Sequence, residues 1–322
     1  MKQKVVIFSQ IDHEILTKLQ QCYHVVQINP KLGDVNQQIL EQGKDADGFI
    51  GAGRLLNEDN LKSAEQLKIV SSVSVGYDNY DLSYLNKRKI WLAHTPHVLT
   101  ETTADLAFTL LMSAAKKVPS LVQWTKQGQW LRTVGPDQFG QDIYGKTLGI
   151  IGLGHIGAAI ARRGFHGFNM NVLYHNRSEK MEIATQFNAE YCELTDLLQR
   201  SDFVVVAVDL NQSSKALIGE AELELMQAHA VLVNISRGSV IDEQALISAL
   251  KNKTIFAAGL DVYEKEPLQN SALFQLENAV TLPHVGSATA QTRKRMAELA
   301  YQNLVDALEG RMPRYLVNKD FN

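Results

Sequence analysis

The stretch Lys146-Thr-Leu-Gly-Ile-Ile-Gly-Leu-Gly-His-Ile-Gly157 decides the fold of this 322-residue chain. Its apolar run, Leu148 to Ile151, leads directly into the pattern Gly-x-Gly-x-x-Gly, and helix-forming residues follow. A buried strand, a glycine-rich turn and a helix in this order are typical of a dinucleotide site. The expected binding residues lie in the turn and the first helical turn: Gly152, Leu153, Gly154, His155, Ile156 and Gly157.

Each glycine of this motif has a physical reason. We expect Gly152 to allow a tight turn, Gly154 to let the backbone approach a pyrophosphate, and Gly157 to let the helix pack on the strand. Unpaired N–H groups at the helix N-terminus would attract the phosphates. The alternative is a purely structural turn, because glycine is common and the pattern is short.

Composition limits the class of protein. An apolar content of 45% and a charged content of 21% are those of an ordinary globular protein, and a net charge of −3 gives no reason to expect nucleic acid. Cys22 and Cys192 lie far apart, no metal-ligand spacing is present, and no apolar run is long enough for a signal peptide or a membrane span. We therefore expect a cytoplasmic protein without metal, membrane or nucleic-acid partners.

Strands alternate with helical segments on both sides of the glycine motif. We expect strands at 5–8, 24–28, 48–51, 68–75, 90–93, 148–151, 171–174, 203–208, 231–235 and 255–260. We expect helices at 35–42, 61–67, 100–118, 242–251 and 288–308. This alternation predicts an α/β protein with doubly wound parallel sheets, and the two series are too long for one sheet. Two domains with a ligand cleft between them follow.

The region after the helix at 100–118 differs in composition. Pro119 is expected to end that helix, and Trp124 to Asp142 has two tryptophans, three glycines and a proline. This composition predicts an irregular arm within 119–145. Exposed aromatic side chains on the arm would suit a dimer contact, and packing against the parent domain is the alternative.

The end of the second strand after the motif bears on the choice of cofactor. NAD-binding folds usually place an acidic residue there to bind the ribose hydroxyls. This chain has His175 at that position, and the first acidic residue after it is Glu179. Arg177, with Asn176 and Ser178 beside it, suits a 2′-phosphate. The sequence therefore favours NADP, with NADPH preferred and NAD as the second choice. A solvent-exposed polar loop is the alternative interpretation.

Two later strand ends and the segment before the last helix carry side chains suited to carboxylate binding and proton transfer. Arg237 follows an apolar strand and would either hold a substrate carboxylate or form an interdomain salt bridge. Asp261 and Glu266 follow the next strand, and His284 lies in a Pro- and Gly-flanked segment before the last helix. A carboxylate stabilises the protonated form of a neighbouring imidazole, which suits a general acid.

Together these motifs resemble the D-isomer-specific 2-hydroxyacid dehydrogenases over nearly the whole chain. The matching segments are Gly152 to Gly157, Asn234-x-x-Arg-Gly238, Gly259-Leu-Asp-Val262 with Glu266-Pro267, Leu282-Pro-His-Val-Gly-Ser-Ala288 and Ser74-Val-Gly-Tyr-Asp-Asn79. Within the family, the sequence is most similar to bacterial glyoxylate/hydroxypyruvate reductases of the 2-ketoaldonate reductase type.

The resemblance implies a domain plan and an activity. It implies a Rossmann nucleotide-binding domain at 100–289, including a dimerisation arm near 119–145, and a discontinuous flavodoxin-like substrate domain at 1–99 and 290–322. The implied activity of the homodimer is NADPH-dependent reduction of glyoxylate to glycolate or of hydroxypyruvate to D-glycerate. Alternatives are a 2-ketogluconate reductase, a short-form phosphoglycerate dehydrogenase and a dinucleotide-sensing corepressor.

The resemblance also implies roles for single residues. Arg237 would bind the substrate carboxylate and carbonyl, and His284 would protonate the carbonyl oxygen with Glu266 orienting and charging it. The backbone N–H groups of Val75 and Gly76 would hold the carboxylate from the other domain. Further implied cofactor contacts are Asn176, Arg177, Ser178, Ile235, Ser236, Asp261 (on the nicotinamide carboxamide) and Gly286, with Thr103 and Ser214 as weaker candidates.

Two positions depart from the family pattern. His175 replaces the usual ribose-binding acid, which supports NADPH, and Asp209 stands where proline is expected, which puts the cofactor contacts of that loop in doubt.

Overall fold

The computed structural model describes residues 2–321, which form two compact units. The first, called here the N-terminal unit, contains the chain up to Leu99 and again from Ala288. The second, called the central unit, is Thr100–Ser287. The return to the N-terminal unit thus begins two residues before the expected position 290. Both units are parallel-sheet α/β structures, which confirms the predicted fold class.

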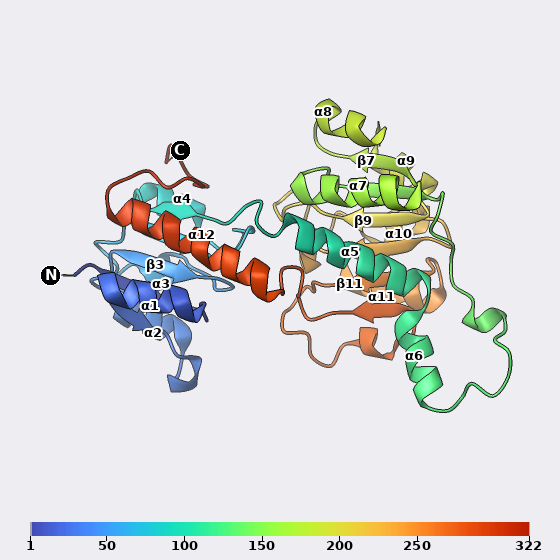
Figure 1. Cartoon of the computed structure of the whole chain (residues 1–322), viewed down its shortest axis with the longest axis horizontal. Helices are drawn as coiled ribbons and strands as arrows, with labels where there is room; N and C mark the ends of the chain where they lie inside the picture. The colour runs from blue at the N-terminus through green and yellow to red at the C-terminus, as the bar shows by residue number, and fades with distance from the viewer. Residues whose placement is uncertain (1, 322) are drawn as a thin grey trace. The chain divides into compact units, whose positions relative to one another are not determined.

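The N-terminal unit contains a five-stranded parallel sheet in the order β2-β1-β3-β4-β5, the flavodoxin-like order (Figure 1). Its strands are β1 (Lys4–Ile7), β2 (His24–Gln27), β3 (Gly48–Gly51), β4 (Ile69–Ser72) and β5 (Trp91–Ala93). Its helices are α1 (His13–Cys22), α2 (Val35–Gln42), α3 (Glu58–Leu61), α4 (Leu82–Lys87) and α12 (Ala290–Leu308), with a short 3-10 turn at Pro30–Leu32.

The C-terminal segment belongs to the N-terminal unit because its side chains complete that unit's core. Ser71 Oγ donates a hydrogen bond to the Ala300 carbonyl at 2.7 Å, and α12 packs so tightly that a Cβ on Gly48 would lie 2.7 Å from Leu304. Beyond α12, Asn318 Oδ1 accepts a hydrogen bond from the Leu92 N–H at 2.7 Å. These contacts explain why the sheet needs both ends of the chain.

The central unit contains a seven-stranded parallel sheet in the order β12-β11-β10-β9-β6-β7-β8. Its strands are β6 (Thr147–Ile151), β7 (Asn171–His175), β8 (Glu190–Tyr191), β9 (Phe203–Val206), β10 (Val231–Asn234), β11 (Ala257–Leu260) and β12 (Ala279–Thr281). Its helices are α5 (Thr100–Ala115), α6 (Val118–Lys126), α7 (His155–Phe168), α8 (Met181–Ala184), α9 (Leu194–Arg200), α10 (Glu220–Leu225) and α11 (Glu243–Asn252). Because β6 lies between β7 and β9, the strand order reverses at the glycine motif, where such folds bind ligands.

Helices cover both faces of this central sheet. Val205 packs into the cluster that contains α5 and α7 residues, whereas Val204 and Val206 pack into the cluster on the opposite face. This alternation follows from the two-residue repeat of a strand. Figure 1 shows α5 and α7 crossing the near face, where a Cβ on Gly259 would lie 2.9 Å from the Leu110 Cβ.

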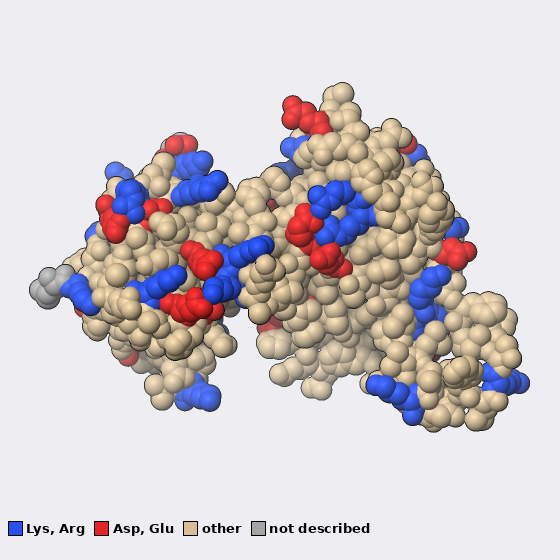
Figure 2. Space-filling model, in the orientation of Figure 1, with Lys and Arg blue, Asp and Glu red and all other residues tan. Residues whose placement is uncertain are grey.

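Ion pairs also join α5 to α7. Arg163 binds both Glu101, at 2.9 Å, and Asp105, and Arg162 binds Glu101 at 2.6 Å. Figure 2 shows this group as adjoining blue and red side chains on the face formed by these helices. Because most of the side chains are exposed, we assign the network about 1 kcal/mol or less per pair.

Several local predictions were wrong. The helix expected at 100–118 ends at Ala115, and Pro119 lies in the first turn of α6 instead of ending α5, because proline fits the first helical turn. The arm at 119–145 therefore starts with a regular helix and is irregular only afterwards, apart from the 3-10 turn Pro136–Gln138. The helix expected at 61–67 is the shorter α3, which ends at Leu61.

Two short strands, β8 and β12, were not among the predicted ones. Strands of two and three residues are too short to show an alternation of apolar and polar positions. Among the helices of residues 2–321, none has the length and apolar character that crossing a bilayer requires.

Candidate active site

Seven loops of the central unit, one after each strand, leave the same edge of its sheet, because all seven strands are parallel. The strand ends lie level with one another, with these residues paired in register: Ile151 with His175 and Val206, Asn234 with Val206 and Leu260, and Leu260 with Thr281. The fold therefore places the glycine motif, the arginine, the acids and the histidine at one edge. Val75 and Gly76 lie in the N-terminal unit, in the loop that follows β4.

The local geometry requires two of the three motif glycines and leaves the third free. Gly152 has a φ of +103°, and a Cβ there would lie 2.5 Å from the Ala207 carbonyl oxygen. A Cβ on Gly157 would overlap the Gly152 carbonyl oxygen. Gly154 differs, because its φ is −88° and no atom lies within 4 Å of its Cβ position. Nothing in the fold requires glycine at 154, so this open space at the start of α7 fits the close approach of a pyrophosphate.

The loop after β7 carries an exposed arginine beside the glycine motif. His175 Nδ1 hydrogen-bonds the Cys192 carbonyl at 3.0 Å, and its ring stacks on Tyr191. Asn176 Oδ1 accepts from the Leu153 N–H at 2.8 Å and so ties this loop to the glycine motif. Arg177 is exposed and forms no hydrogen bond or ion pair with any of residues 2–321. Its guanidinium is therefore free to bind an anion beside the motif.

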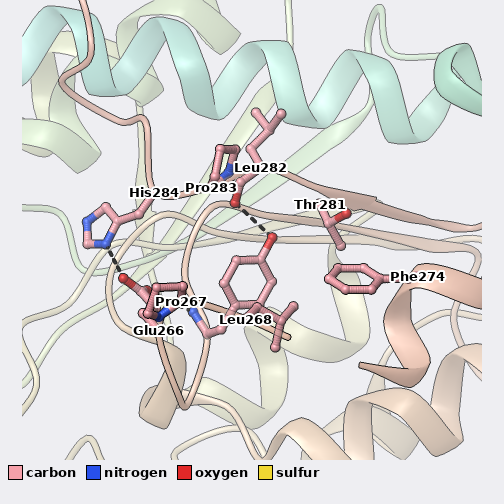
Figure 3. Close-up of a pocket in the computed structure, with 9 residues that line it drawn as sticks. Glu266, Pro267, Leu268, Phe274, Thr281, Leu282, Pro283 and His284 are labelled. Carbon is pink, nitrogen blue, oxygen red and sulfur yellow. Dashed lines mark hydrogen bonds and ion pairs between the residues drawn. The ribbon is translucent and has the colours of Figure 1, made fainter. Parts of the chain in front are cut away.

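A histidine–glutamate pair lies at the other side of the switch point. His284 Nδ1 is 2.6 Å from Glu266 Oε2, and Glu266 Oε1 accepts from the Tyr263 N–H at 3.1 Å (Figure 3). Burial alone would raise the pKa of Glu266, but the hydrogen bond and charge of His284, the Tyr263 N–H and the charge of Arg237 together lower it. The carboxylate is thus ionised and fixed at both oxygens.

The imidazole of His284 is held for contact with a ligand. Its backbone lies in the left-handed region, with a φ of +51°, which is uncommon for a residue other than glycine. Nδ1 faces Glu266, while Nε2 has no hydrogen-bond partner within residues 2–321, and 46% of the side chain is exposed. Nε2 is therefore the atom that can exchange a proton with a bound molecule.

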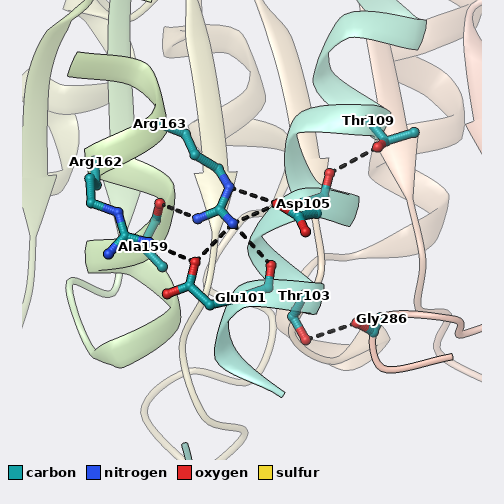
Figure 4. A network of polar contacts seen from close by, with 8 residues as sticks. All are labelled: Glu101, Thr103, Asp105, Thr109, Ala159, Arg162, Arg163 and Gly286. Carbon is teal, nitrogen blue, oxygen red and sulfur yellow. Dashed lines mark hydrogen bonds and ion pairs between the residues drawn. The ribbon is translucent and has the colours of Figure 1, made fainter. Parts of the chain in front are cut away.

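Asp261 holds the backbone on which His284 lies. The side chain is 1% exposed, and its two oxygens accept from the N–H groups of Val285 at 2.7 Å and Gly286 at 2.8 Å. Thr103 Oγ1 donates to the Gly286 carbonyl at 3.0 Å from the first turn of α5 (Figure 4). Burial raises the pKa of Asp261, and the two N–H bonds oppose this effect. The expected contact of Asp261 with nicotinamide stays a prediction.

Arg237 sits in a turn organised by Asn234. Asn234 Oδ1 accepts from the Ser236 N–H and hydroxyl, and its amide donates to the Arg237 carbonyl at 3.0 Å. Arg237 Nη1 donates to the Ser236 carbonyl at 2.9 Å. Arg237 is near enough to Glu266 for its charge to lower that residue's pKa. Arg237 therefore lies in one group with Glu266 and His284, the pair that the family resemblance implied.

A cavity of about 380 Å³ adjoins the histidine–glutamate pair. Its walls are mostly apolar and include Leu268, Phe274 and Leu282 (Figure 3). The Tyr263 hydroxyl donates to the Leu282 carbonyl at 2.8 Å, and burial strongly raises the pKa of this phenol. Tyr263 is thus a neutral structural group that links the turn bearing Glu266 to the strand end before His284.

Some residues near the site were missed or weakly assigned by the sequence. From the sequence, no role was assigned to Asn234 or Tyr263. For Asn234, the presence of a polar residue at the end of an apolar strand could have indicated a role. The hydroxyl of Ser214 donates to the Asp209 carbonyl at 2.6 Å and accepts from the Asn211 N–H, so it holds its own loop. Asp209, which departs from the family pattern, is exposed.

Comparisons with known proteins identify the family of the chain. Residues 108–286 match the family described as D-isomer specific 2-hydroxyacid dehydrogenase, NAD binding domain. The chain is 42% identical over 319 residues to glyoxylate/hydroxypyruvate reductase B of Klebsiella pneumoniae, covering 99% of both chains. It is 42% identical over 323 residues to the reductase of the same name from Escherichia coli, covering 99% of this chain and 98% of that protein.

A solved structure is similar over nearly the whole length. It is an NADPH-dependent glyoxylate/hydroxypyruvate reductase from Sinorhizobium meliloti, crystallised in complex with NADP and malonate. The sequence identity is 31% and the TM-score 0.86, covering 98% of this chain and 97% of the other. A glyoxylate reductase from Paecilomyes thermophila gives a TM-score of 0.87 at 30% identity, covering 98% of each chain.

Proposed function

The chain belongs to the D-isomer specific 2-hydroxyacid dehydrogenases, and from this membership we propose that it reduces glyoxylate and hydroxypyruvate with NADPH. The observation that carries the proposal is the group formed by Arg237, Glu266 and His284 at the sheet edge that also bears the glycine motif. The names of the relatives support the substrate class, since they are reductases of these two keto acids.

The residues at the switch point fit NADPH, which supplies a hydride when it is bound. The open backbone at Gly154 and the N-terminus of α7 would receive the pyrophosphate, and Arg177 with Ser178 the 2′-phosphate. The proposed binding residues are Gly152, Leu153, Gly154, His155, Ile156, Gly157, Asn176, Arg177, Ser178, Ile235, Ser236, Asp261 and Gly286.

The mechanism follows from the charges around the carbonyl. As the keto carbon is reduced, negative charge develops on its oxygen, and His284 Nε2 donates a proton to that atom. Glu266 keeps the imidazole oriented and stabilises its protonated form, and Arg237 holds the carboxylate and offsets the developing charge. Because His284 is half-exposed, it can regain a proton from water after each turnover.

Two residues of the N-terminal unit are also proposed to bind the substrate. We assign the backbone N–H groups of Val75 and Gly76 to the substrate carboxylate, and thus the substrate domain to residues 1–99 with 288–322. We assign dimerisation to the arm at 119–145, because Trp130, Leu131 and Phe139 are exposed there by 63%, 87% and 58%. A homodimer in the cytoplasm remains a prediction.

Steady-state assays test the proposal directly. Purified full-length enzyme is expected to oxidise NADPH with glyoxylate and hydroxypyruvate, and more weakly with 2-ketogluconate or phosphohydroxypyruvate. Absence of turnover on all four acids, with NADPH or NADH, would reject the enzyme and leave a dinucleotide-binding protein. A clear preference for phosphohydroxypyruvate would instead identify a short phosphoglycerate dehydrogenase.

Cofactor preference is expected to depend on Arg177. Arg177→Ala should raise the KM for NADPH roughly 10- to 100-fold, the value of a charge-assisted hydrogen bond, and leave the KM for NADH unchanged. Lys180→Ala removes a neighbouring exposed cation and serves as the matched control, for which we expect less than a threefold change. Equal effects of Arg177→Ala on both cofactors would contradict recognition of the 2′-phosphate.

A further inference from the structure

In the N-terminal unit, an imidazole is bonded to the backbone of the loop that carries Val75 and Gly76. His94 Nδ1 lies 2.9 Å from the Val75 carbonyl oxygen. His94 directly follows β5 and Val75 lies in the loop after β4, and these neighbouring parallel strands end at the same sheet edge. Since a carbonyl oxygen only accepts, Nδ1 must carry the hydrogen and donate it.

This bond determines the direction of the next amide. The Val75 C=O and the Gly76 N–H belong to one planar trans peptide group, in which they point in opposite directions. With the carbonyl directed at His94, the Gly76 N–H points away from the imidazole. A hydrogen bond to the carbonyl also polarises the amide, which makes its N–H a stronger donor.

The backbone and the ring of His94 are held from several sides. The His94 N–H donates to the Tyr315 carbonyl at 3.1 Å, and its own carbonyl accepts from the buried amide of Asn303, on α12, at 3.1 Å. The Tyr77 ring meets the imidazole edge-on, with 5.9 Å between ring centroids. His94 is thus fixed by the C-terminal part of the chain and by the loop that it supports.

We propose that His94 is a positioning residue for the substrate carboxylate, acting through the Val75–Gly76 peptide. It aims the Gly76 N–H at the carboxylate and strengthens that hydrogen bond, without touching the reacting atoms. The inference rests on the proposed function, in which this loop receives the carboxylate. It gives α12 and the C-terminal segment a part in substrate affinity, because both hold His94 in place.

Two substitutions separate the hydrogen bond from the shape of the ring. His94→Phe keeps a ring beside Tyr77 and removes the donor, so the KM for glyoxylate should rise about tenfold, with kcat within about threefold of wild type. His94→Asn places an amide N–H near the position of Nδ1 and should restore KM to within about threefold. His13→Phe, at an exposed position at the start of α1, is the control and should change neither constant.

Binding of oxamate, a non-reacting 2-keto acid analogue, to the NADPH-loaded enzyme gives a readout that needs no turnover. Calorimetry should show about tenfold weaker oxamate binding by His94→Phe and an unchanged Kd for NADPH. If His94→Phe does not fold, His94→Gln replaces it. The glutamine amide would lie near the position of the imidazole Nε2, so the Val75 carbonyl would lose its hydrogen-bond donor. Thermal unfolding identifies which variants are folded.

The outcomes distinguish this proposal from the proposed function. A wild-type enzyme without keto-acid turnover and without oxamate binding would reject the function. With an active wild type, unchanged glyoxylate KM and oxamate Kd in the folded donor-less variant would overturn the role of His94. A loss confined to kcat, or an Asn variant as impaired as the donor-less one, would overturn it as well.

Discussion

Replacing His284 with alanine is expected to lower kcat for glyoxylate reduction roughly 10²- to 10⁴-fold, the usual contribution of a general acid. The Kd for NADPH should change less than about threefold, because the imidazole faces Glu266 and not the glycine motif. Rapid-mixing measurement of NADPH oxidation, together with NADPH binding, checks both values. An unchanged kcat in a folded variant would remove His284 from its proposed role.

A second histidine–carboxylate pair provides the control. His229 Nε2 lies 2.7 Å from Asp202 Oδ1. His229 comes just before β10 and Asp202 just before β9, so this pair lies at the edge of the sheet opposite to the candidate site. His229→Ala removes an imidazole of the same type and should leave kcat within about threefold of wild type. A loss of kcat as large as that of His284→Ala would show that the effect is structural.

Replacing Glu266 with glutamine tests the contribution of its negative charge to catalysis. The pKa of Glu266 is lowered, so its carboxylate is ionised at neutral pH, and the stabilisation from the ion pair is lost only as pH falls through that lowered value. Glu266→Gln removes this charge at every pH. We therefore expect kcat/KM of Glu266→Gln to lie below wild type wherever the wild-type carboxylate is ionised, and the difference to shrink as pH falls through the lowered pKa of Glu266.

Replacing Arg237 with alanine is expected to lower kcat/KM roughly 10²- to 10³-fold, the value of one preorganised donor at a developing oxyanion. Both the substrate carboxylate and the carbonyl oxygen would lose a cation. Arg237→Lys keeps the charge but not the planar pair of donors, so its activity should lie between alanine and wild type. Unfolding in denaturant and NADPH binding check that the variants are intact.

The result for Arg237 separates two interpretations of this arginine. A loss of stability without a loss of kcat/KM would support the interdomain salt bridge that the sequence left open. If kcat/KM of Arg237→Lys equals that of wild type, positive charge alone is sufficient and the two parallel N–H donors of the guanidinium are not needed. An alanine variant within about threefold of wild type would contradict the role.

The regular parts of the fold were predictable because buried parallel strands have continuous apolar sequences. Val5 to Ile7, Ile150 and Val204 to Val206 are fully or almost fully buried, and no polar residue could occupy their positions without losing hydrogen bonds to water. The glycine motif was also predictable, since Gly152 and Gly157 are demanded by local geometry alone. Pro119 was misjudged because proline is compatible both with the end of a helix and with the first turn of one, and only the second applies here.

The sequence by itself determined the two α/β series, the dinucleotide motif and the residue types that carry the proposed chemistry. Only the tertiary structure decided which groups are occupied by other contacts and which remain available. It uses one oxygen of Glu266 on His284 and the other on the Tyr263 N–H, uses both oxygens of Asp261 on backbone N–H groups, and leaves Arg177 without a hydrogen-bond or ion-pair partner among residues 2–321. The physical reason is that strand patterns are local, whereas hydrogen-bond partners are set by the sheet order that brings distant loops to one edge.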